Sequence, residues 1–172
     1  MRAVLALGAN IGDRAATLQA ALDGLGAHTR VVAVSAIFET APVGGPPQPD
    51  FYNAVVLVDT TLAATDLLAV AHSLEAAAGR VRLEHWGPRT LDVDVLAYDD
   101  TRSDDPQLTL PHPRAHERAF VVSPWLEIEP DGRIDGHGTL AELSAELGTA
   151  GVRRLDAPVL RTPRFPTASV VT

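Results

Sequence analysis

The sequence of 172 residues contains no cysteine and no lysine, so the 14 positions counted as Lys or Arg are all arginine. Without cysteine the chain has no disulfide, no thiolate zinc site and no cysteine nucleophile. Without lysine it cannot complete the phosphate-binding motif G-x-x-x-x-G-K-[ST], and the dinucleotide-binding motif G-x-G-x-x-G does not occur either. A nucleotide site in this chain is therefore expected to depend on arginine and on another backbone arrangement.

Long apolar runs are also missing. No stretch approaches the ~18 to 20 apolar residues that cross a bilayer, and no apolar segment follows basic residues at the start. A formal net charge of −8 argues against a broad nucleic-acid surface, because phosphate backbones bind extended positive faces. We therefore expect a cytoplasmic protein with neither a membrane segment nor a nucleic-acid partner.

The composition is that of one globular domain, with 46% hydrophobic and 21% charged residues. Strand-like runs at residues 2–7, 31–38, 51–59 and 91–98 alternate with two helical patterns, one after Asp13 and one at 65–78. The order strand, helix, strand, strand, helix, strand predicts an α+β fold. We expect a ferredoxin-like two-layer sandwich with a mostly antiparallel sheet and flanking helices.

The second half of the chain predicts shorter elements. A helical piece at 111–118 leads into an apolar stretch at 120–128, and Thr139 with Glu142 forms a capping-box pattern before a last helix. After residue 150 three prolines occur without a regular period. We expect a single catalytic domain at 1–150, acting as a monomer, and an extended or partly disordered tail at 151–172.

The sequence DVD at 92–94 is the sharpest local feature. Alternation assigns six residues of this strand to two faces: Asp92, Asp94 and Leu96 to one, and Val93, Val95 and Ala97 to the other. Carboxylates at i and i+2 lie ~6.6 Å apart at their bases and can tilt together onto magnesium. A polar edge strand is the plainer interpretation of the same pair.

Arginines occur on both sides of these aspartates. They are Arg80, Arg82, Arg89, Arg114 and Arg118. A guanidinium group binds phosphate oxygens in pairs, and phosphoryl transfer is catalysed mainly by positioning and charge stabilisation. The pattern therefore indicates a polyphosphate with its metal, while ordinary surface charge remains the alternative.

Other candidate ligand groups are Phe51 and Asn53, which share one strand face and would present a ring and an amide to a flat heterocycle. Taken singly, Phe51 and Phe120 fit the core better than a ligand contact, because phenylalanine is usually buried. His112 and His116 could ligate a metal, but no third ligand is suitably spaced to complete a zinc site, so a histidine at the surface or facing an anion is expected. The glycine-containing turn at 7–13 either admits a ligand or simply joins a strand to a helix.

Six blocks follow one another between residues 4 and 130: LGANIGD at 7–13, FETAPVG at 38–44, QPDFYNAV at 48–55, E-x-x-x-GRVR at 75–82, WGPRTLDVDVL at 86–96 and LPHPRAHERAFVVSPWLEI at 110–128. In this order they resemble the hydroxymethyldihydropterin pyrophosphokinase family. The GPRTLDVDVL and PHPR segments are the most specific of them.

The resemblance implies transfer of pyrophosphate from ATP to 6-hydroxymethyl-7,8-dihydropterin, with release of AMP, in tetrahydrofolate biosynthesis. It implies two Mg2+ ions bound by Asp92 and Asp94. The catalytic residues it implies are these two aspartates together with Arg82 and Arg89. The residues implied to contact the pterin are Thr40, Val43, Phe51, Asn53 and Phe120. Those implied to contact ATP are Glu75, Arg82, Arg89, Thr109, His112 and Arg118.

Two other functions fit parts of the pattern. A nucleotidyl- or glycosyltransferase of the D-x-D type would use the same metal with a different acceptor. A non-catalytic ferredoxin-like module that senses nucleotide would not need the two carboxylates. Ligand choice separates the first alternative from the pyrophosphokinase. Unchanged function in Asp92→Ala and Asp94→Ala would support the second.

Overall fold

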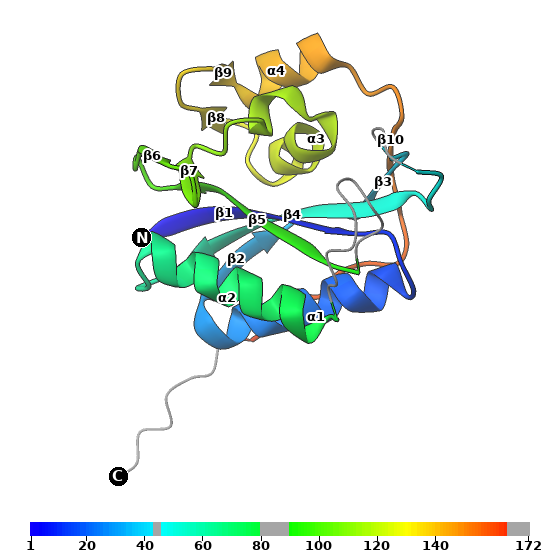
Figure 1. The fold of residues 1–172 in the computed structure, drawn as a ribbon. Helices are drawn as coiled ribbons and strands as arrows, with labels where there is room; N and C mark the ends of the chain where they lie inside the picture. The colour runs from blue at the N-terminus through cyan, green and yellow to red at the C-terminus, as the bar shows by residue number, and fades with distance from the viewer. Residues whose placement is uncertain (43–45, 80–89, 165–172) are drawn as a thin grey trace.

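A six-stranded antiparallel sheet forms the centre of the protein in a computed structural model, which describes residues 1–42, 46–79 and 90–164 (Figure 1). Its strands are β1 (Arg2–Ala9), β2 (Arg30–Val34), β3 (Phe38–Thr40), β4 (Phe51–Asp59), β5 (Asp92–Tyr98) and β10 (Val152–Arg154). The order across the sheet is β10-β3-β4-β1-β5, and β2 pairs with β4 beyond the end of β3. This order, with a helix after β1 and another after β4, confirms the ferredoxin-like prediction.

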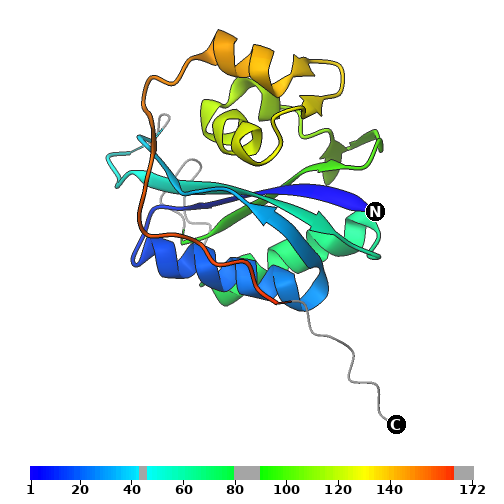
Figure 2. The same cartoon turned by 180° about the vertical axis from the view of Figure 1, so that it is seen from behind.

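Helices cover both faces of the sheet. Figures 1 and 2 show α1 (Arg14–His28) and α2 (Ala64–Ala77) on one face, and α3 (Ala119–Ile128) and α4 (Leu140–Leu147) on the other. The short 3-10 helix η1 (Ala115–Glu117) precedes α3. The predicted two layers are therefore present, and the last two helices add a third layer.

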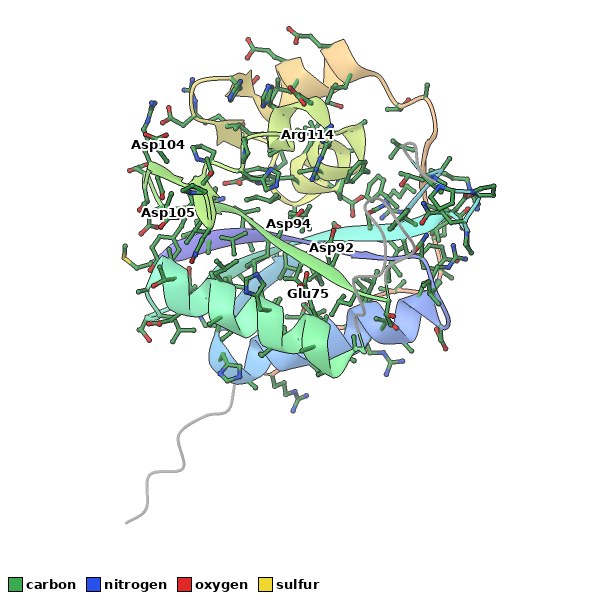
Figure 3. All side chains as sticks on the ribbon, viewed as in Figure 1. Glu75, Asp92, Asp94, Asp104, Asp105 and Arg114 are labelled. Carbon is green, nitrogen blue, oxygen red and sulfur yellow. The ribbon has the colours of Figure 1, made fainter. Side chains whose placement is uncertain are left out.

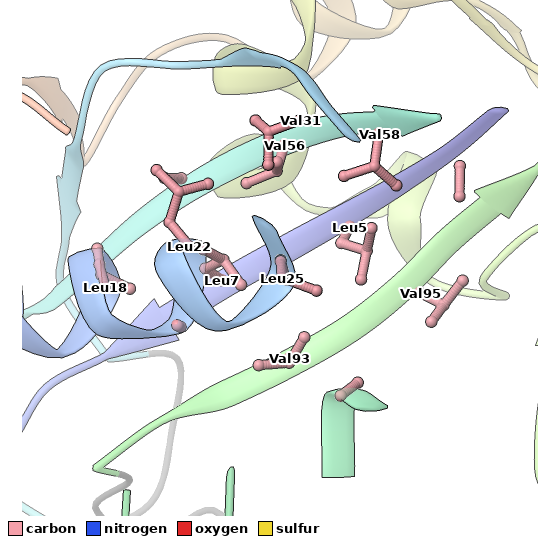
Figure 4. Close-up of a cluster of buried hydrophobic side chains, with 14 of the residues drawn as sticks. Leu5, Leu7, Leu18, Leu22, Leu25, Val31, Val56, Val58, Val93 and Val95 are labelled. Atoms are coloured by element: carbon pink, nitrogen blue, oxygen red, sulfur yellow. The ribbon is translucent and has the colours of Figure 1, made fainter. Parts of the chain in front are cut away.

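The core beneath α1 and α2 follows directly from the sequence pattern. Alternate residues of β1, including Leu5 and Leu7, point toward α1, where three leucines at helical spacing meet them (Figure 4). Those leucines are Leu18, Leu22 and Leu25, each completely buried. Burying a leucine side chain stabilises a fold by about 1.5–3 kcal/mol, so this contact fixes α1 on the sheet.

A second core lies between the sheet and the last two helices. Val4 and Val55 point into it from neighbouring strands, and Trp125 of α3 and Leu140 of α4 close it. Since β1 and β4 are buried on both faces, their sequences read as continuous apolar runs rather than as alternating ones.

The strand predicted at 31–38 is interrupted. β2 ends at Val34 and β3 begins at Phe38, and Ser35 bridges the break through both its backbone and its side chain. Its N–H donates to the Val55 carbonyl at 3.0 Å, and its hydroxyl accepts from the Val55 N–H at 3.0 Å. A side chain thus replaces one step of the β-ladder.

The predicted alternation of β5 is wrong at Ala97. A register shift pairs Val4 with Ala97 and Leu5 with Val95, which leaves Leu96 as an extra residue. Leu96 and Ala97 consequently both pack on the α3 side, whereas Val93 and Val95 belong to the core beneath α1. Such a β-bulge changes side-chain direction by one position, and the apolar sequence gives no sign of it.

The helix ends agree with their sequence signals. Asp13 caps α1 by accepting the Ala16 N–H at 3.0 Å, and Gly79 follows α2 with a φ of 72°. Thr139 and Glu142 form the predicted capping box of α4.

Two small hairpins lie outside the main sheet. They are β6 (Ser103–Asp105) with β7 (Leu108–Leu110), and β8 (Arg133–Ile134) with β9 (Gly138–Thr139). The first of them lies between β5 and η1. The segment at 151–164 is largely extended but contributes β10, a strand that the sequence did not indicate.

Within the ranges that the structure describes, no helix has the length and apolar character that a membrane crossing requires.

Candidate active site

Three neighbouring strands bring an amide and a carboxylate to either side of a glycine. Gly8 of β1 pairs with Asn53 of β4 on one side and with Asp92 of β5 on the other. A Cβ at Gly8 would lie 3.3 Å from Asn53 Oδ1 and 4.0 Å from the Cβ of Asp92. The glycine therefore leaves the space between the two polar side chains free of a third side chain.

Asp92 and Asp94 lie on the same face of β5. They pair with Gly8 and Ala6 of β1, and Ala6 packs against the core on the α3 side. Figure 3 shows both carboxylates on the side of β5 that faces α3. The predicted common face is confirmed, while the binding of metal by these residues stays a prediction.

Two side chains, Arg118 and His112, lie close to the Asp94 carboxylate. Arg118 Nη1 lies 3.5 Å from Asp94 Oδ2, and His112 Nε2 lies 3.9 Å from the same oxygen. The Arg118 guanidinium carbon also lies 5.7 Å from the centre of the Phe120 ring. Residues of β5, of the segment before η1 and of the start of α3 are thus brought to one place.

The imidazole of His112 has a lowered pKa. Burial lowers its pKa from the usual 6.5, Asp94 opposes this shift and Arg118 adds to it. The Nδ1 atom accepts the Arg114 N–H at 3.2 Å, so the ring proton belongs on Nε2, the nitrogen that faces Asp94. The His112 N–H donates to the Leu96 carbonyl at 2.8 Å, which fixes the residue beside β5.

The expected pterin contacts that the structure describes lie on the same side of the sheet. Asn53 is buried and donates through Nδ2 to Thr40 Oγ1 at 2.9 Å and to the Phe38 carbonyl at 3.4 Å. Phe51 is half-buried two residues before it on β4, and Phe120 is half-buried in the first turn of α3.

Glu75 and Thr109 have other surroundings. Glu75 is buried on α2, across β5 from the aspartates, and its Oε1 accepts the Val93 N–H at 2.9 Å (Figure 3). Glu75 therefore holds the backbone between the two aspartates. Thr109 lies on β7 and donates its hydroxyl hydrogen to the Asp105 carbonyl at 3.0 Å.

Three of the predicted site residues, Val43, Arg82 and Arg89, lie outside the described residues. The same holds for Arg80. In the part of the chain that the structure describes, no group of three or more His, Cys, Asp or Glu side chains is arranged to hold a metal ion.

A polar anchor beside the site was not predicted from the sequence. Asn10 is buried and donates through Nδ2 to Gln48 Oε1 at 2.8 Å and to the Pro49 carbonyl at 3.0 Å. Arg14 donates to the Asp50 carbonyl at 2.7 Å. These bonds fix the chain just before Phe51. The blocks LGANIGD and QPDFYNAV contain Asn10 and its two acceptors, and Arg14 follows the first block, but only the fold brings them together.

The chain is similar to proteins of one named family. The sequence model described as 7,8-dihydro-6-hydroxymethylpterin-pyrophosphokinase (HPPK) matches residues 4–130. The chain is 48% identical over 157 residues to 2-amino-4-hydroxy-6-hydroxymethyldihydropteridine pyrophosphokinase of Methylorubrum extorquens, covering 90% of this chain and 99% of the relative. It is 41% identical over 156 residues to the protein of the same name from Pseudomonas aeruginosa, covering 90% and 96%.

Among solved structures, Plasmodium falciparum HPPK-DHPS wild type with pterin and p-hydroxybenzoate superposes with a TM-score of 0.66 at 16% identity. The match covers 89% of this chain and 46% of that one, so the chain spans about half the length of this larger protein. At that identity the likeness concerns the fold alone. The sequence matches are far stronger, and by them the chain belongs to the 7,8-dihydro-6-hydroxymethylpterin-pyrophosphokinase family.

Proposed function

We propose that the face of the sheet beneath α3 is where this chain carries out its family's reaction in folate biosynthesis. In that reaction the hydroxymethyl oxygen of 6-hydroxymethyl-7,8-dihydropterin attacks the β-phosphorus of ATP, the bond to the α-phosphate oxygen breaks, and AMP leaves. The observation that carries the proposal is the row Asn53, Gly8 and Asp92 across three strands. It offers a heterocycle-binding amide and a metal-binding carboxylate side by side.

The pterin is assigned to the β4 end of this row. Its ring would lie between Phe51 and Phe120, since flat heterocycles stack on aromatic rings, and Asn53 would bond to the ring edge. The Asn53 Nδ2 group already bonds to β3, which leaves Oδ1 directed toward Gly8. Thr40 supports the pterin indirectly, by holding that amide.

ATP is assigned to the β5 end, beside Asp92 and Asp94. Two carboxylates on one strand face suit Mg2+, which usually takes one or two carboxylates and completes its shell with water and phosphate oxygens. Two Mg2+ ions bound at these carboxylates would neutralise negative charge on the phosphates.

Arg118 and His112 are assigned to the phosphates. Arg118 lies 3.5 Å from Asp94 Oδ2 and can bond to a phosphate oxygen while it stays near that carboxylate. His112 would donate from Nε2, because its Nδ1 accepts the Arg114 N–H. Arg82 and Arg89 are assigned to the same triphosphate from the sequence resemblance alone, and Glu75 is assigned to keep β5 in place beneath it.

Equilibrium binding tests the proposal. We expect titration of the full-length protein with 6-hydroxymethylpterin to show tighter binding when magnesium and a non-hydrolysable ATP analogue are present. A stronger response to a sugar nucleotide would instead support the D-x-D glycosyltransferase alternative. Binding of ATP without any pterin binding would support the nucleotide-sensing module.

A further inference from the structure

The segment that follows α4 runs along the edge of the sheet to the opposite face. We call residues 152–163 the C-terminal strap. Figure 2 shows it descending from the α4 side, passing β3 at the sheet edge and continuing along α1. The family match ends at residue 130, so the match assigns no role to this segment.

The first part of the C-terminal strap pairs with β3 over the whole length of that strand. Residues 152–154 form β10, with Val152 opposite Thr40 and Arg154 opposite Phe38. The Leu155 N–H donates to the Ile37 carbonyl at 2.8 Å. Because β3 contains only three residues, these contacts are a large part of what holds it in the sheet.

Side chains strengthen the same connection. Arg153 pairs with Glu39 of β3, and Glu39 also lies 3.6 Å from Arg14 of α1. Arg154 donates to Glu127 Oε2 of α3 at 2.8 Å. The C-terminal strap therefore connects β3 to the helices on both faces of the sheet.

The far part of the C-terminal strap is fixed to α1. Leu155 and Leu160 are buried in the core beneath α1 and α2. Gln19 accepts the Arg161 N–H at 2.8 Å and donates to the Arg161 carbonyl at 2.9 Å. At Gly26 a Cβ would lie only 2.4 Å from Pro163 Cγ, so the chain contacts the helix backbone closely there.

β3 in turn orients Asn53. The Asn53 amide nitrogen donates to the Phe38 carbonyl and to the Thr40 hydroxyl, and both of these residues belong to β3. A displacement of β3 by a few tenths of an ångström would weaken the 3.4 Å bond to Phe38 and let the amide turn. The C-terminal strap and Asn53 are thus linked through one short strand.

We infer that the C-terminal strap is a positioning element for the pterin site: it holds β3, and β3 holds the Asn53 amide in the orientation that bonds to the pterin edge. This inference rests on the proposed function of that site. It predicts that damage to a strap anchor remote from the site weakens pterin binding specifically.

Leu160→Ala in the full-length chain is the primary test, with Val159→Ala as the matched control. Leu160 is 7% exposed and Val159 is 71% exposed, so only the first substitution loosens the C-terminal strap. We expect the Kd for the pterin to rise about three- to tenfold, the effect of losing one hydrogen bond. The Kd for ATP should change less than about twofold, and Leu160→Met should restore pterin binding because it conserves volume.

A double-substitution cycle separates positioning from general destabilisation. In an Asn53→Ala background, Leu160→Ala should have no further effect on the pterin Kd, since the amide it orients is gone. An equal loss of ATP and pterin affinity, or a full effect of Leu160→Ala without Asn53, would overturn the inference. Should Leu160→Ala fail to fold, Gln19→Glu replaces it, because that change removes the bond to the Arg161 carbonyl. Gln19 also donates to Asp23 Oδ1 at 2.9 Å, so Asp23→Ala, which removes only that second bond, is its control.

Hydrogen exchange distinguishes failure of this inference from failure of the proposed function. Amides of β3 should exchange faster in Leu160→Ala than in Val159→Ala, whether or not the wild type binds pterin. Faster exchange in Leu160→Ala, together with no pterin binding by the wild type, would overturn the proposed function. It would still support the link between the C-terminal strap and β3. Unchanged exchange would overturn the link itself.

Discussion

At the residue scale, Asp94 lies close to two side chains that can carry positive charge. Its Oδ2 faces both Arg118 and His112, and its own side chain is 35% exposed. It can therefore exchange protein partners for a metal and phosphate without leaving a buried charge unpaired. This combination of a held carboxylate and a reachable oxygen suits a metal ligand.

Asp94→Asn should lower the rate of AMP formation about 10²- to 10³-fold, the usual effect of losing one charge-stabilising group in an active site. The amide keeps the shape of the carboxylate, so the thermal midpoint should change little. Asp104→Asn on the exposed β6 strand removes the same charge as a control and should keep wild-type turnover. Near-normal turnover of Asp94→Asn would contradict the metal assignment.

Asn53→Asp tests the amide that contacts β3. A carboxylate cannot donate to the Phe38 carbonyl or to Thr40, and it faces that carbonyl with like partial charge. We expect the free energy of unfolding to fall by about 1–3 kcal/mol in urea titrations, and pterin binding to weaken as well. Thr40→Ser keeps the hydroxyl and should leave both quantities nearly unchanged. Unaltered stability of Asn53→Asp would show that these bonds do not form in solution.

Sequence reasoning located the residues of the site that repeat at strand spacing. Asp92 with Asp94, and Phe51 with Asn53, lie two positions apart, so the pleat alone predicts that each pair shares a face. The surroundings of Glu75 and Asn10 could not be predicted in this way. Each of these side chains contacts backbone that is distant in sequence, and only the packed fold brings the partners together.

At the element scale, the clearest agreement between sequence and structure concerns helix ends, since caps depend on neighbours in the chain. Thr139 and Glu142 bond reciprocally at the start of α4. The Thr139 backbone and hydroxyl donors hold the pKa of the Glu142 carboxyl below its usual value of 4.5. The β5 bulge and the break between β2 and β3 have no such local signal.

The α4 cap should make stability depend on pH. The folded-state pKa of Glu142 is depressed, so the unfolded chain takes up a proton first as the pH falls, and the stabilisation present above 4.5 is lost below it. We expect the advantage of the wild type over Glu142→Gln in unfolding free energy to shrink between about pH 6 and about pH 3. Glu146→Gln on the same helix lies outside the cap and is the control. A difference that stays constant with pH would contradict the cap.

At the scale of the whole molecule, one sheet serves two cores. Leu22 belongs to the core beneath α1, and Trp125 belongs to the core beneath α3. Strands β1 and β4 contribute side chains to both cores. Unfolding of either helical layer would therefore expose apolar side chains of the sheet to water. The protein is therefore expected to unfold as one cooperative unit.

Leu22→Ala tests this cooperativity in a Trp86→Phe background, where Trp125 is the one remaining tryptophan of the two in the sequence. Truncating a buried leucine costs about 2–5 kcal/mol. The urea midpoint should fall equally by Trp125 fluorescence and by circular dichroism, although Leu22 and Trp125 lie on opposite faces. A fluorescence midpoint that does not move would show that the α3 and α4 layer unfolds separately.

The most direct test of the central claim, that the α3 face of the sheet joins Mg-bound ATP to a stacked pterin, is product analysis by phosphorus NMR. The protein is incubated with ATP, magnesium and 6-hydroxymethyl-7,8-dihydropterin. We predict signals of AMP and of a pterin diphosphate, both absent when the pterin is omitted. Formation of ADP instead of AMP, or of AMP at the same rate without pterin, would contradict the claim.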